Sequence, residues 1–207
     1  MPAEMEMHNE LQEIVNAAKR ASDLTRQLLI FSRKHIVQPK IVNINDLIKD
    51  LEKMLNRLIG ENIKVKNILS ENIFKIKADP GQIQQIIMNL VINARDAMPL
   101  GGEITIETNN VLVNEENAIK YQGANFGQYV ELKVKDNGTG MDEATLNRIF
   151  EPFFTTKEAG KGTGLGLSTV FGIVKQSEGY IFVDSELNKV TLFTMIFPKT
   201  TEKLNYQ

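Results

Sequence analysis

Residues 80–98 carry the pattern that most constrains the fold, because one apolar stripe recurs along their whole length. The stripe follows the i, i+3, i+4 and i+7 spacing of an amphipathic helix with one buried face. Pro80 with Asp79 before it is typical of a helix start. The stripe consists of Ile83, Ile86, Ile87, Leu90, Val91, Ala94, Ala97 and Met98. The sequence therefore predicts a helix that packs one face against a core.

The segments around this helix alternate between short strands and helices without a regular strand–helix–strand repeat. That order favours an α+β fold over a doubly wound parallel sheet. Asn45 or Asp46 can cap a helix that runs to about Ile59 and is closed by Gly60. We expect further helices at 142–150 and about 167–176, and strands at 40–44, 63–69, 74–77, 103–113, 129–134, 180–184 and 191–197.

Composition and charge narrow the classes of function. Lys and Arg number 24 against 26 Asp and Glu, so the formal net charge of -2 gives no argument for nucleic acid or an anionic membrane as a partner. The chain has no Cys, which excludes disulfides and thiolate zinc sites, and its 2 His are too few for a His-rich metal centre. No apolar run approaches the roughly 18 residues of a membrane span, so we expect this chain to be soluble, without membrane contact of its own. We expect a cytoplasmic location, and a membrane anchor elsewhere in the intact protein stays open.

The first 38 residues form a predicted segment of their own. Apolar residues from Leu11 to Ser32 alternate three and four apart, which indicates one long amphipathic helix that Gln38-Pro39 ends. The stripe is wide, so we expect this helix to pack against a partner helix. We divide the chain into this segment, a domain over residues 39–200 and a polar tail over residues 201–207.

Three polar side chains lie along one edge of the apolar stripe at residues 80–98. At about 100° per residue, Asn89, Asn93 and Asp96 share one narrow sector. The two Asn are one turn apart, and their neutral carbonyl oxygens suit Mg²⁺ when water and phosphate supply the rest of its coordination. Asn is also common on surfaces, so a solvent-facing pair is the alternative.

Two glycine-rich segments have the composition of ligand-binding loops. Asp136 to Gly140 follows a strand, where a carboxylate can accept a hydrogen bond from the amine of a base; standing alone, an ordinary Asp-Asn-Gly turn is the simpler interpretation. Gly160 to Ser168 runs into a helix, so backbone N–H groups and a helix N-terminus converge on an anion site. This segment lacks the GKS/T ending of a Walker loop and follows no strand, which disfavours both Walker and Rossmann phosphate sites.

Between these segments, residues 150–157 combine an aromatic run with the start of a Gly-flanked stretch. The run Phe150-Glu151-Pro152-Phe153-Phe154 predicts a hinge, and the residues after it have the composition of a lid. An aromatic anchor that fixes a long loop to the core is the alternative, and both can hold.

Taken together and in this order, the four segments resemble the nucleotide-binding domain of sensor histidine kinases and their ATPase relatives. Asn89 to Ala94 resembles the N box of that family, Asp136 to Gly140 its first Gly box, Phe150 to Phe154 its F box and Gly162 to Gly166 its second Gly box. The resemblance covers residues 40–198, and residues 20–33 resemble the second helix of the kinase dimerisation hairpin. It implies a two-layer α/β sandwich of the Bergerat type, with a mixed, mostly antiparallel sheet covered by helices on one face, preceded by a long N-terminal helix.

The resemblance also implies the roles of individual residues. Asn93, assisted by Asn89, coordinates Mg²⁺ bridging the phosphates, and Asp136 receives the adenine amino group. Gly138 and Gly140 let the base lie close. The remaining residues of the implied ATP site are Arg95, Asp96, Met141, Phe150, Phe154, Thr155, Lys157, Gly162, Thr163, Gly164, Leu165, Gly166, Leu167 and Thr191.

The chain departs from the family pattern at two places. Asp96 stands where many kinases carry Lys, so the phosphate contact implied for its neighbour Arg95 differs in its surroundings. Asn188 and Val190 precede Thr191, where the family often shows Gly. Asn can adopt a positive φ but Val resists it, so this turn is predicted to differ in shape.

Asn89 separates kinases from hydrolases within the resemblance, because the hydrolytic relatives carry Glu at this position to activate water. An amide cannot act as that base, so we expect ATP to be held for an external nucleophile. His8 is followed by Asn9 rather than by an acidic residue, and His35 lies after the predicted helix. We therefore expect the phosphoaccepting His to be absent from this chain. We expect the chain to be a fragment of a longer kinase, and the fragment alone to be unable to autophosphorylate.

The function implied is that of the ATP-binding catalytic domain of a two-component sensor histidine kinase. It binds ATP or ADP with Mg²⁺ and donates the γ-phosphoryl group to a His on a dimerisation helix. The expected partners are a second copy in the intact kinase and the receiver domain of a response regulator. Two alternatives stay open: a nucleotide-gated binding module without kinase activity, and a slow ATPase, which Asn89 disfavours.

Overall fold

The computed structural model describes residues 38–158 and 162–201. The chain divides into two compact units: described residues 38–155 and 164–201 belong to one, and residues 156–158 and 162–163 to the other. The predicted helix at residues 11–32 and the tail after residue 201 lie outside the described residues.

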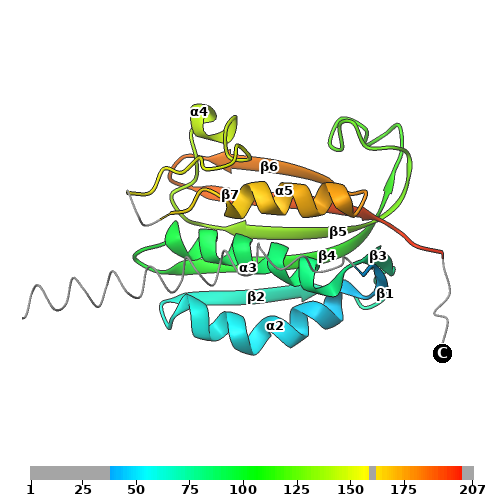
Figure 1. Ribbon diagram of the computed structural model, residues 1–207, viewed down its shortest axis with the longest axis horizontal. Coiled ribbons are helices and arrows are strands. Elements are labelled where there is room, and N and C mark those ends of the chain that lie inside the picture. Colours follow the sequence, from blue (N-terminus) through cyan, green and yellow to red (C-terminus); the bar gives the residue numbers. More distant parts are fainter. Residues whose placement is uncertain (1–37, 159–161, 202–207) are drawn as a thin grey trace, which may run out of the picture. The chain divides into compact units, whose positions relative to one another are not determined.

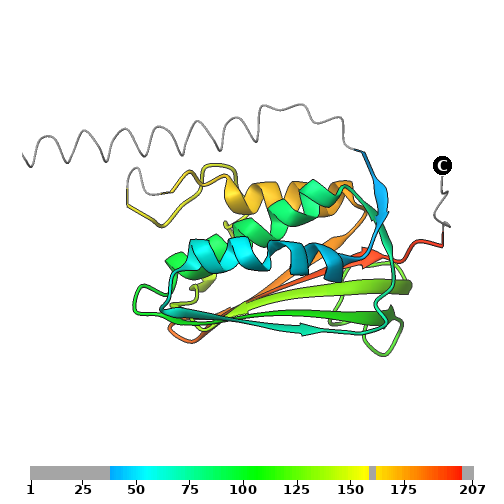
Figure 2. The ribbon, with the colours of Figure 1, turned by 90° about the horizontal axis from the view of Figure 1, so that it is seen from below.

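The larger unit has two layers, as Figures 1 and 2 show, with a five-stranded sheet covered on one face by helices. The strand order is β2-β4-β5-β7-β6. The strands are β2 (Ile63–Leu69), β4 (Gly102–Val113), β5 (Gly127–Asp136), β6 (Tyr180–Glu186) and β7 (Val190–Pro198). The helices are α2 (Ile44–Ile59), α3 (Pro80–Asp96) and α5 (Gly166–Gln176), with the single turn α4 (Glu143–Leu146) beyond β5. A separate two-stranded sheet pairs β1 (Lys40–Val42) with β3 (Ile76–Ala78).

Strand pairing in the large sheet is mixed, as the resemblance implies. β2 runs parallel to β4, with Ile63 opposite Gly102, and the other neighbours are antiparallel. A parallel pair needs a long crossover connection, and β3 with α3 supplies it between β2 and β4. The α+β prediction and the helices on one face are thus confirmed.

The main core fills the space between the helices and this sheet. On β5, Val130, Leu132 and Val134 alternate with polar residues and are buried, as a strand with one covered face requires. The predicted stripe of α3 packs onto them, and Ile83, Ile86, Ile87, Leu90 and Val91 are at most 1% exposed. Full burial of an aliphatic side chain of this size contributes about 1.5–3 kcal/mol, so this layer of α3 fixes the helix over the sheet.

The predicted caps of α2, Asn45 or Asp46, are wrong by two and three residues. Asn43 is the cap, and its side chain accepts a hydrogen bond from the amide of Asn45 at 2.9 Å. Asn45 itself is buried in the first turn, where it donates to Ser70 O at 2.7 Å and accepts from Thr108 Oγ1 at 2.7 Å. The Asn45 side chain, which has the residue type of a cap, is therefore used for tertiary hydrogen bonds to Ser70 and Thr108.

Several other boundaries differ from the sequence prediction. The strand predicted at 40–44 ends at Val42, because α2 begins at Ile44, and the strand predicted at 129–134 extends over Gly127–Asp136. The second short strand is Ile76–Ala78 rather than residues 74–77, because it pairs with β1 in the register Val42 opposite Ile76. The helical pattern at 142–150 gives only Glu143–Leu146, followed by turns. Asp142 caps this short helix by accepting from the amide of Thr145 at 2.8 Å.

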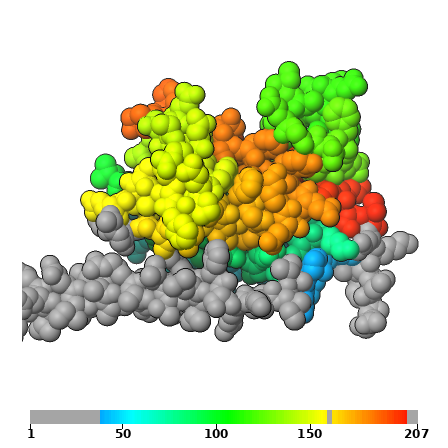
Figure 3. Space-filling model, turned by 45° about the horizontal axis from the view of Figure 1, so that its top comes forward, coloured from blue at the N-terminus to red at the C-terminus, as the bar shows by residue number. Residues whose placement is uncertain are grey.

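The opposite face of the sheet carries a second, smaller core under the segment between β4 and β5. Val113, Tyr121, Tyr129 and Ile196 are buried there. Figure 3 shows this segment in green, standing beside the orange surface to which β6 belongs, and Tyr121 meets the Phe182 ring of β6 at 5.8 Å. The second core closes over the buried carboxylate of Glu131, which binds Lys133 at 2.8 Å and the Tyr121 hydroxyl at 2.9 Å.

Candidate functional site

Asp136 is the last residue of the central strand β5, and its side chain is buried at 5% exposure. Its Oδ1 accepts a hydrogen bond from the amide of Gly138 at 3.0 Å. Within residues 38–158 and 162–201 no other hydrogen bond reaches this carboxylate. Burial raises the pKa of the Asp136 carboxyl above its ordinary value, and the Gly138 amide offsets that shift only in part. A buried carboxylate with spare acceptor capacity favours a donor from outside the chain.

Thr191, far away in the sequence, lies directly opposite Asp136. The register of β5 and β7 pairs the two residues, and the register of β6 and β7 pairs Ser185 with Thr191. Directly opposite residues share one face of a sheet with Cβ atoms about 4.5–5.5 Å apart. The buried Thr191 hydroxyl lies 3.2 Å from Ser185 Oγ, and the amide of Met141 donates to the same Oγ at 2.9 Å. Strand register thus places Thr191 opposite Asp136, and Ser185, which the sequence prediction missed, joins Thr191 to Met141.

The segment from Gly138 to Gly140 is held between the end of α3 and the turn that joins β6 to β7. The amide of Thr139 donates to Ala97 O at 3.1 Å, and Thr139 O accepts from the amide of Asn188 at 2.6 Å. A Cβ on Gly138 would lie 2.7 Å from Ala97 O. Gly140 has φ 59°, and a Cβ there would overlap Glu186 O. The packing of the chain alone requires both glycines. The close approach of a base, which the resemblance implies, is a second and separate reason for them.

The turn between β6 and β7 contains one residue with a positive φ. Asn188 has φ 60°, a value that Asn can adopt. Val190 is extended and pairs with Glu186 at the first position of β7, so it needs no positive φ. The predicted difference in shape from the turn of the family stays a prediction.

Asn89 and Asn93 lie on the side of α3 that faces the start of α5. Asn89 Nδ2 donates to Gly166 O at 3.2 Å. A Cβ on Gly166 would lie 3.8 Å from Asn93 Nδ2 and 4.0 Å from Asn89 Cγ. Both Asn side chains are half-buried, which disfavours the solvent-facing alternative.

The N-terminus of α5 is the other half of this arrangement. The cap residue is Leu165, whose apolar side chain cannot accept a hydrogen bond, and no side chain of the described residues caps the helix. The hydroxyls of Ser168 and Thr169 both donate to Leu165 O, at 3.0 and 2.7 Å. The first-turn N–H groups and the positive end of the helix dipole therefore lie beside the two Asn amides.

The described residues contain no group of three or more His, Cys, Asp or Glu side chains that could hold a metal ion. A metal at this place would depend on amide oxygens together with the phosphates and waters of a ligand. Asn89 and Asn93 beside an uncapped helix N-terminus fit that kind of site, which suits Mg²⁺.

The aromatic run after α4 packs against α5 and is hydrogen-bonded to the backbone of Gly164. The Phe150 ring packs on the Phe171 ring of α5 at 5.2 Å, and the Arg148 guanidinium lies over the Phe154 ring at 4.3 Å. The amide of Phe153 donates to Gly164 O at 2.9 Å, and a Cβ on Gly164, at φ 65°, would overlap the backbone of Phe153. The alternative of an aromatic anchor is therefore confirmed for Phe150.

The other predicted residues of this region fall into both units. Thr155, Leu165 and Leu167 belong to the unit that contains Asp136, and Leu167 packs partly against the main core. Lys157, Gly162 and Thr163 belong to the other unit, so their role in a lid stays a prediction.

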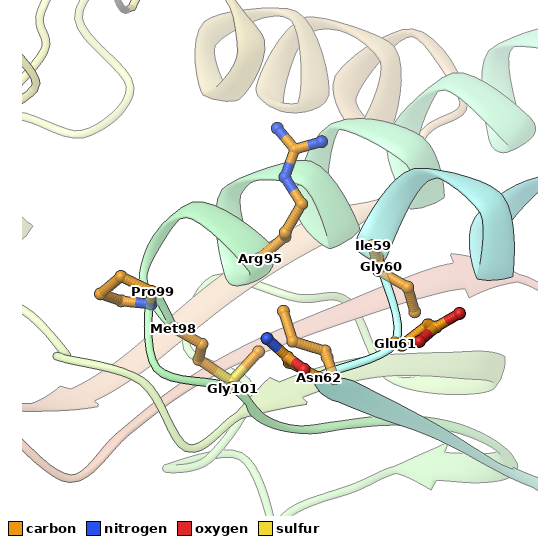
Figure 4. Close-up of a pocket in the computed structure, with 9 residues that line it drawn as sticks. Ile59, Gly60, Glu61, Asn62, Arg95, Met98, Pro99 and Gly101 are labelled. Atoms are coloured by element: carbon orange, nitrogen blue, oxygen red, sulfur yellow. The ribbon is translucent and has the colours of Figure 1, made fainter.

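Arg95 and Asp96 are the last two residues of α3, and the Arg95 side chain reaches the end of α2. The Arg95 guanidinium donates to Leu58 O at 3.0 Å and to Asp96 Oδ1 at 2.7 and 2.9 Å. Arg95 also lines a cavity of about 430 Å³. Figure 4 shows the Arg95 side chain above the other lining residues. The cavity is lined by Ile59, Gly60, Glu61, Asn62, Ile63, Arg95, Met98, Pro99 and Gly101. Arg95 thus satisfies a terminal carbonyl of α2, and its implied phosphate contact stays a prediction.

The fold and this site define a class of protein. The chain belongs to the family of histidine kinase-, DNA gyrase B- and HSP90-like ATPases, whose model matches residues 78–201, more than half of its length. Within residues 38–158 and 162–201, no helix is both long enough and apolar enough to cross a membrane.

Individual relatives narrow the class to histidine kinases. Sensor kinase CckA of Brucella abortus (strain 2308) is 44% identical over 194 residues, 94% of this chain and 20% of that protein. The catalytic domain of the histidine kinase ThkA has a TM-score of 0.59 and 28% identity, over 78% of this chain and 96% of that chain. ThkA in complex with the response regulator TrrA has a TM-score of 0.63 and 26% identity, over 92% of this chain and 50% of that chain.

The chain therefore carries the ATP-binding catalytic domain found in histidine kinases, which confirms the resemblance. It spans 20% to 40% of the length of the first curated relatives it matches.

Proposed function

We propose that this chain binds Mg·ATP and donates the γ-phosphoryl group to a His on a kinase dimerisation helix. The observation that carries the proposal is the Asp136 carboxylate, which is buried at the end of β5 and has one donor, the Gly138 amide, among the residues that the structure describes. An amine on the ligand would supply the missing donor, and the exocyclic amine of adenine is such a group. Asp136 then selects the base, with Thr191 on the neighbouring strand.

The phosphates of the nucleotide are assigned to the region between α3 and α5. The uncapped N-terminus of α5 offers N–H donors to an anion, and the Asn89 and Asn93 amides lie beside it. Mg²⁺, when bound, would neutralise phosphate charge, with Asn93 as its main protein ligand and Asn89 assisting. A Gly-rich lid, with Gly162, Gly164 and Gly166 giving its backbone contacts to phosphate, is part of this proposal.

The absence of a carboxylate at residue 89 supports transfer to another protein rather than to water. The Asn89 amide donates to Gly166 O and has no basicity at neutral pH, so it cannot deprotonate a water molecule. Phosphoryl transfer in such a site depends on positioning and on charge neutralisation, with the acceptor supplying its own nucleophile.

The acceptor is proposed to be a His on a dimerisation helix. His8 and His35 lie outside the described residues, and neither has the neighbours of a phosphoaccepting His. In the intact kinase we propose a homodimer and a cytoplasmic location for this domain. The receiver domain of a response regulator is the proposed downstream partner, supported by the ThkA relative that is in complex with one.

Calorimetric titration with ADP and ATP, with and without Mg²⁺, tests the binding step. Asp136→Asn should weaken the binding of both nucleotides by about tenfold or more, because the amide presents an N–H toward the amine and loses the charge-assisted hydrogen bond. Asp184→Asn is the matched control, since it makes the same chemical change at an exposed residue of β6. Equal affinities of wild type and Asp136→Asn would contradict the assignment of the base.

A further inference from the structure

Ser185 has no predicted role, but its hydroxyl makes several hydrogen bonds in this region. It lies near the end of β6, on the face of the strand that Ile181 and Val183 present to the main core. Its Oγ lies 2.9 Å from Val190 O, 2.9 Å from the Met141 amide and 3.2 Å from Thr191 Oγ1. One hydroxyl therefore joins the segment after Asp136, the strand β6 and the start of β7.

The donors and acceptors of this hydroxyl can be assigned by counting. Val190 O can only accept, so the single Ser185 proton goes to it. The Met141 N–H can only donate, so it takes one lone pair of Ser185 Oγ. With its proton used, Ser185 can only accept from Thr191, so the Thr191 hydroxyl proton points toward Ser185.

That assignment decides what Thr191 offers to a ligand. With its proton directed to Ser185, Thr191 Oγ1 has only lone pairs left, and the Asp136 carboxylate opposite it is also an acceptor. A 6-aminopurine presents N–H donors to such a pair, whereas a 6-oxopurine presents an acceptor in the same place. Buried acceptors left without donors reject a ligand more strongly than a lost apolar contact does.

We propose that Ser185 is a positioning residue that orients the Thr191 hydroxyl and thereby makes the site specific for 6-aminopurine over 6-oxopurine nucleotides. This inference rests on the proposed function, because it requires the purine to lie against Asp136 and Thr191. Ser185 itself does not touch the nucleotide. It acts through Thr191 and through the Met141 backbone.

The test is the ratio of ADP affinity to IDP affinity, measured by calorimetry on the whole chain. These two nucleotides differ only at the base edge, so a general loss of stability weakens both and leaves the ratio unchanged. Ser185→Ala frees the Thr191 hydroxyl to rotate and donate, and the ratio should fall about fivefold, the equivalent of one ordinary hydrogen bond. Ser185→Thr keeps the hydroxyl and should preserve the ratio. Asp184→Ala, an exposed neighbour on the same strand, should also preserve it.

Because Ser185 acts through Thr191, the two substitutions must not add. Thr191→Val should lower the ratio by itself, and Ser185→Ala in that background should lower it no further. Thr191→Val also carries the test if Ser185→Ala fails to fold. An unchanged ratio in a folded Ser185→Ala or Thr191→Val chain that binds ADP would overturn the inference alone. Failure of the wild-type chain to bind ADP would overturn the proposed function and this inference with it.

Discussion

Replacing Gly140 with Ala is expected to destabilise the larger unit more than the same change at any open glycine. The left-handed φ of 59° costs an Ala about 1 kcal/mol. The added Cβ would also overlap Glu186 O, so the turn between β6 and β7 must move. That movement breaks the Asn188–Thr139 hydrogen bond of 2.6 Å and the Met141–Ser185 hydrogen bond of 2.9 Å. At about 1 kcal/mol for each hydrogen bond, the total loss is about 3 kcal/mol.

Thermal unfolding followed by circular dichroism measures this loss. For a domain of this size about 1 kcal/mol corresponds to about 2–4 °C, so Gly140→Ala should lower Tm by about 6–12 °C. Gly123→Ala is the matched control, because Gly123 has φ 79° with no atom within 4 Å of its added Cβ. Gly123→Ala incurs only the cost of the left-handed backbone conformation, so its Tm should fall by about 2–4 °C. Equal shifts in the two variants would refute the reasoning from the clash.

Three further predictions concern buried polar groups. Burial disfavours the charged form of Glu131, but its hydrogen bond to Lys133 and the neighbouring donors outweigh this and hold the pKa of the carboxyl below its ordinary value. The Glu131 carboxylate therefore contributes its full stabilisation above the unfolded-state pKa, and this is lost as the pH falls through the lower folded-state pKa. In urea unfolding, Glu131→Gln should cost about 1–3 kcal/mol at pH 7. The cost should become progressively smaller toward about pH 3. Burial raises the pKa of Asp136, so the folded state gains stability as the pH falls through that raised pKa. Asp136→Asn should remove this pH dependence and stabilise the unliganded chain at pH 7 by about 1 kcal/mol. A loss of stability at pH 7 would contradict the burial argument. Asn45→Ala removes the donor to Ser70 O and the acceptor of the buried Thr108 hydroxyl proton, and should cost about 2–3 kcal/mol. The exposed Asn56→Ala on the same helix should cost less than about 0.5 kcal/mol, as chemical unfolding would measure.

Regular periodicity is what made most of the fold predictable. The stripe of α3 and the alternation of the strands depend on which face is buried, and that is written into spacing along the chain. Asn43 and Asn45 mark where this reasoning ends. Both are good caps by residue type, and only the distant Ser70 and Thr108 decide which one is used inside the core.

The candidate site divides in the same way. Asp136, Asn89 and Asn93 were predicted, because a resemblance over local segments identifies residues that stand inside recognisable motifs. Ser185 was missed, because its role depends on strand register and on a turn between other elements. Its only signal in the sequence is a polar side chain on the face of β6 that Ile181 and Val183 make apolar.

The measurement that tests the central claim most directly is transfer of labelled phosphate from γ-labelled ATP to a separately supplied dimerisation hairpin with its phosphoaccepting His. The account predicts label on that His that is stable in base and labile in acid and forms only with Mg²⁺. At ATP concentrations below saturation, the label should be strongly reduced in Asp136→Asn and Asn93→Ala. A chain that binds ADP but never labels the hairpin would be a nucleotide-gated binding module. Rapid phosphate release without any hairpin would make it an ATPase, and either result would contradict the account.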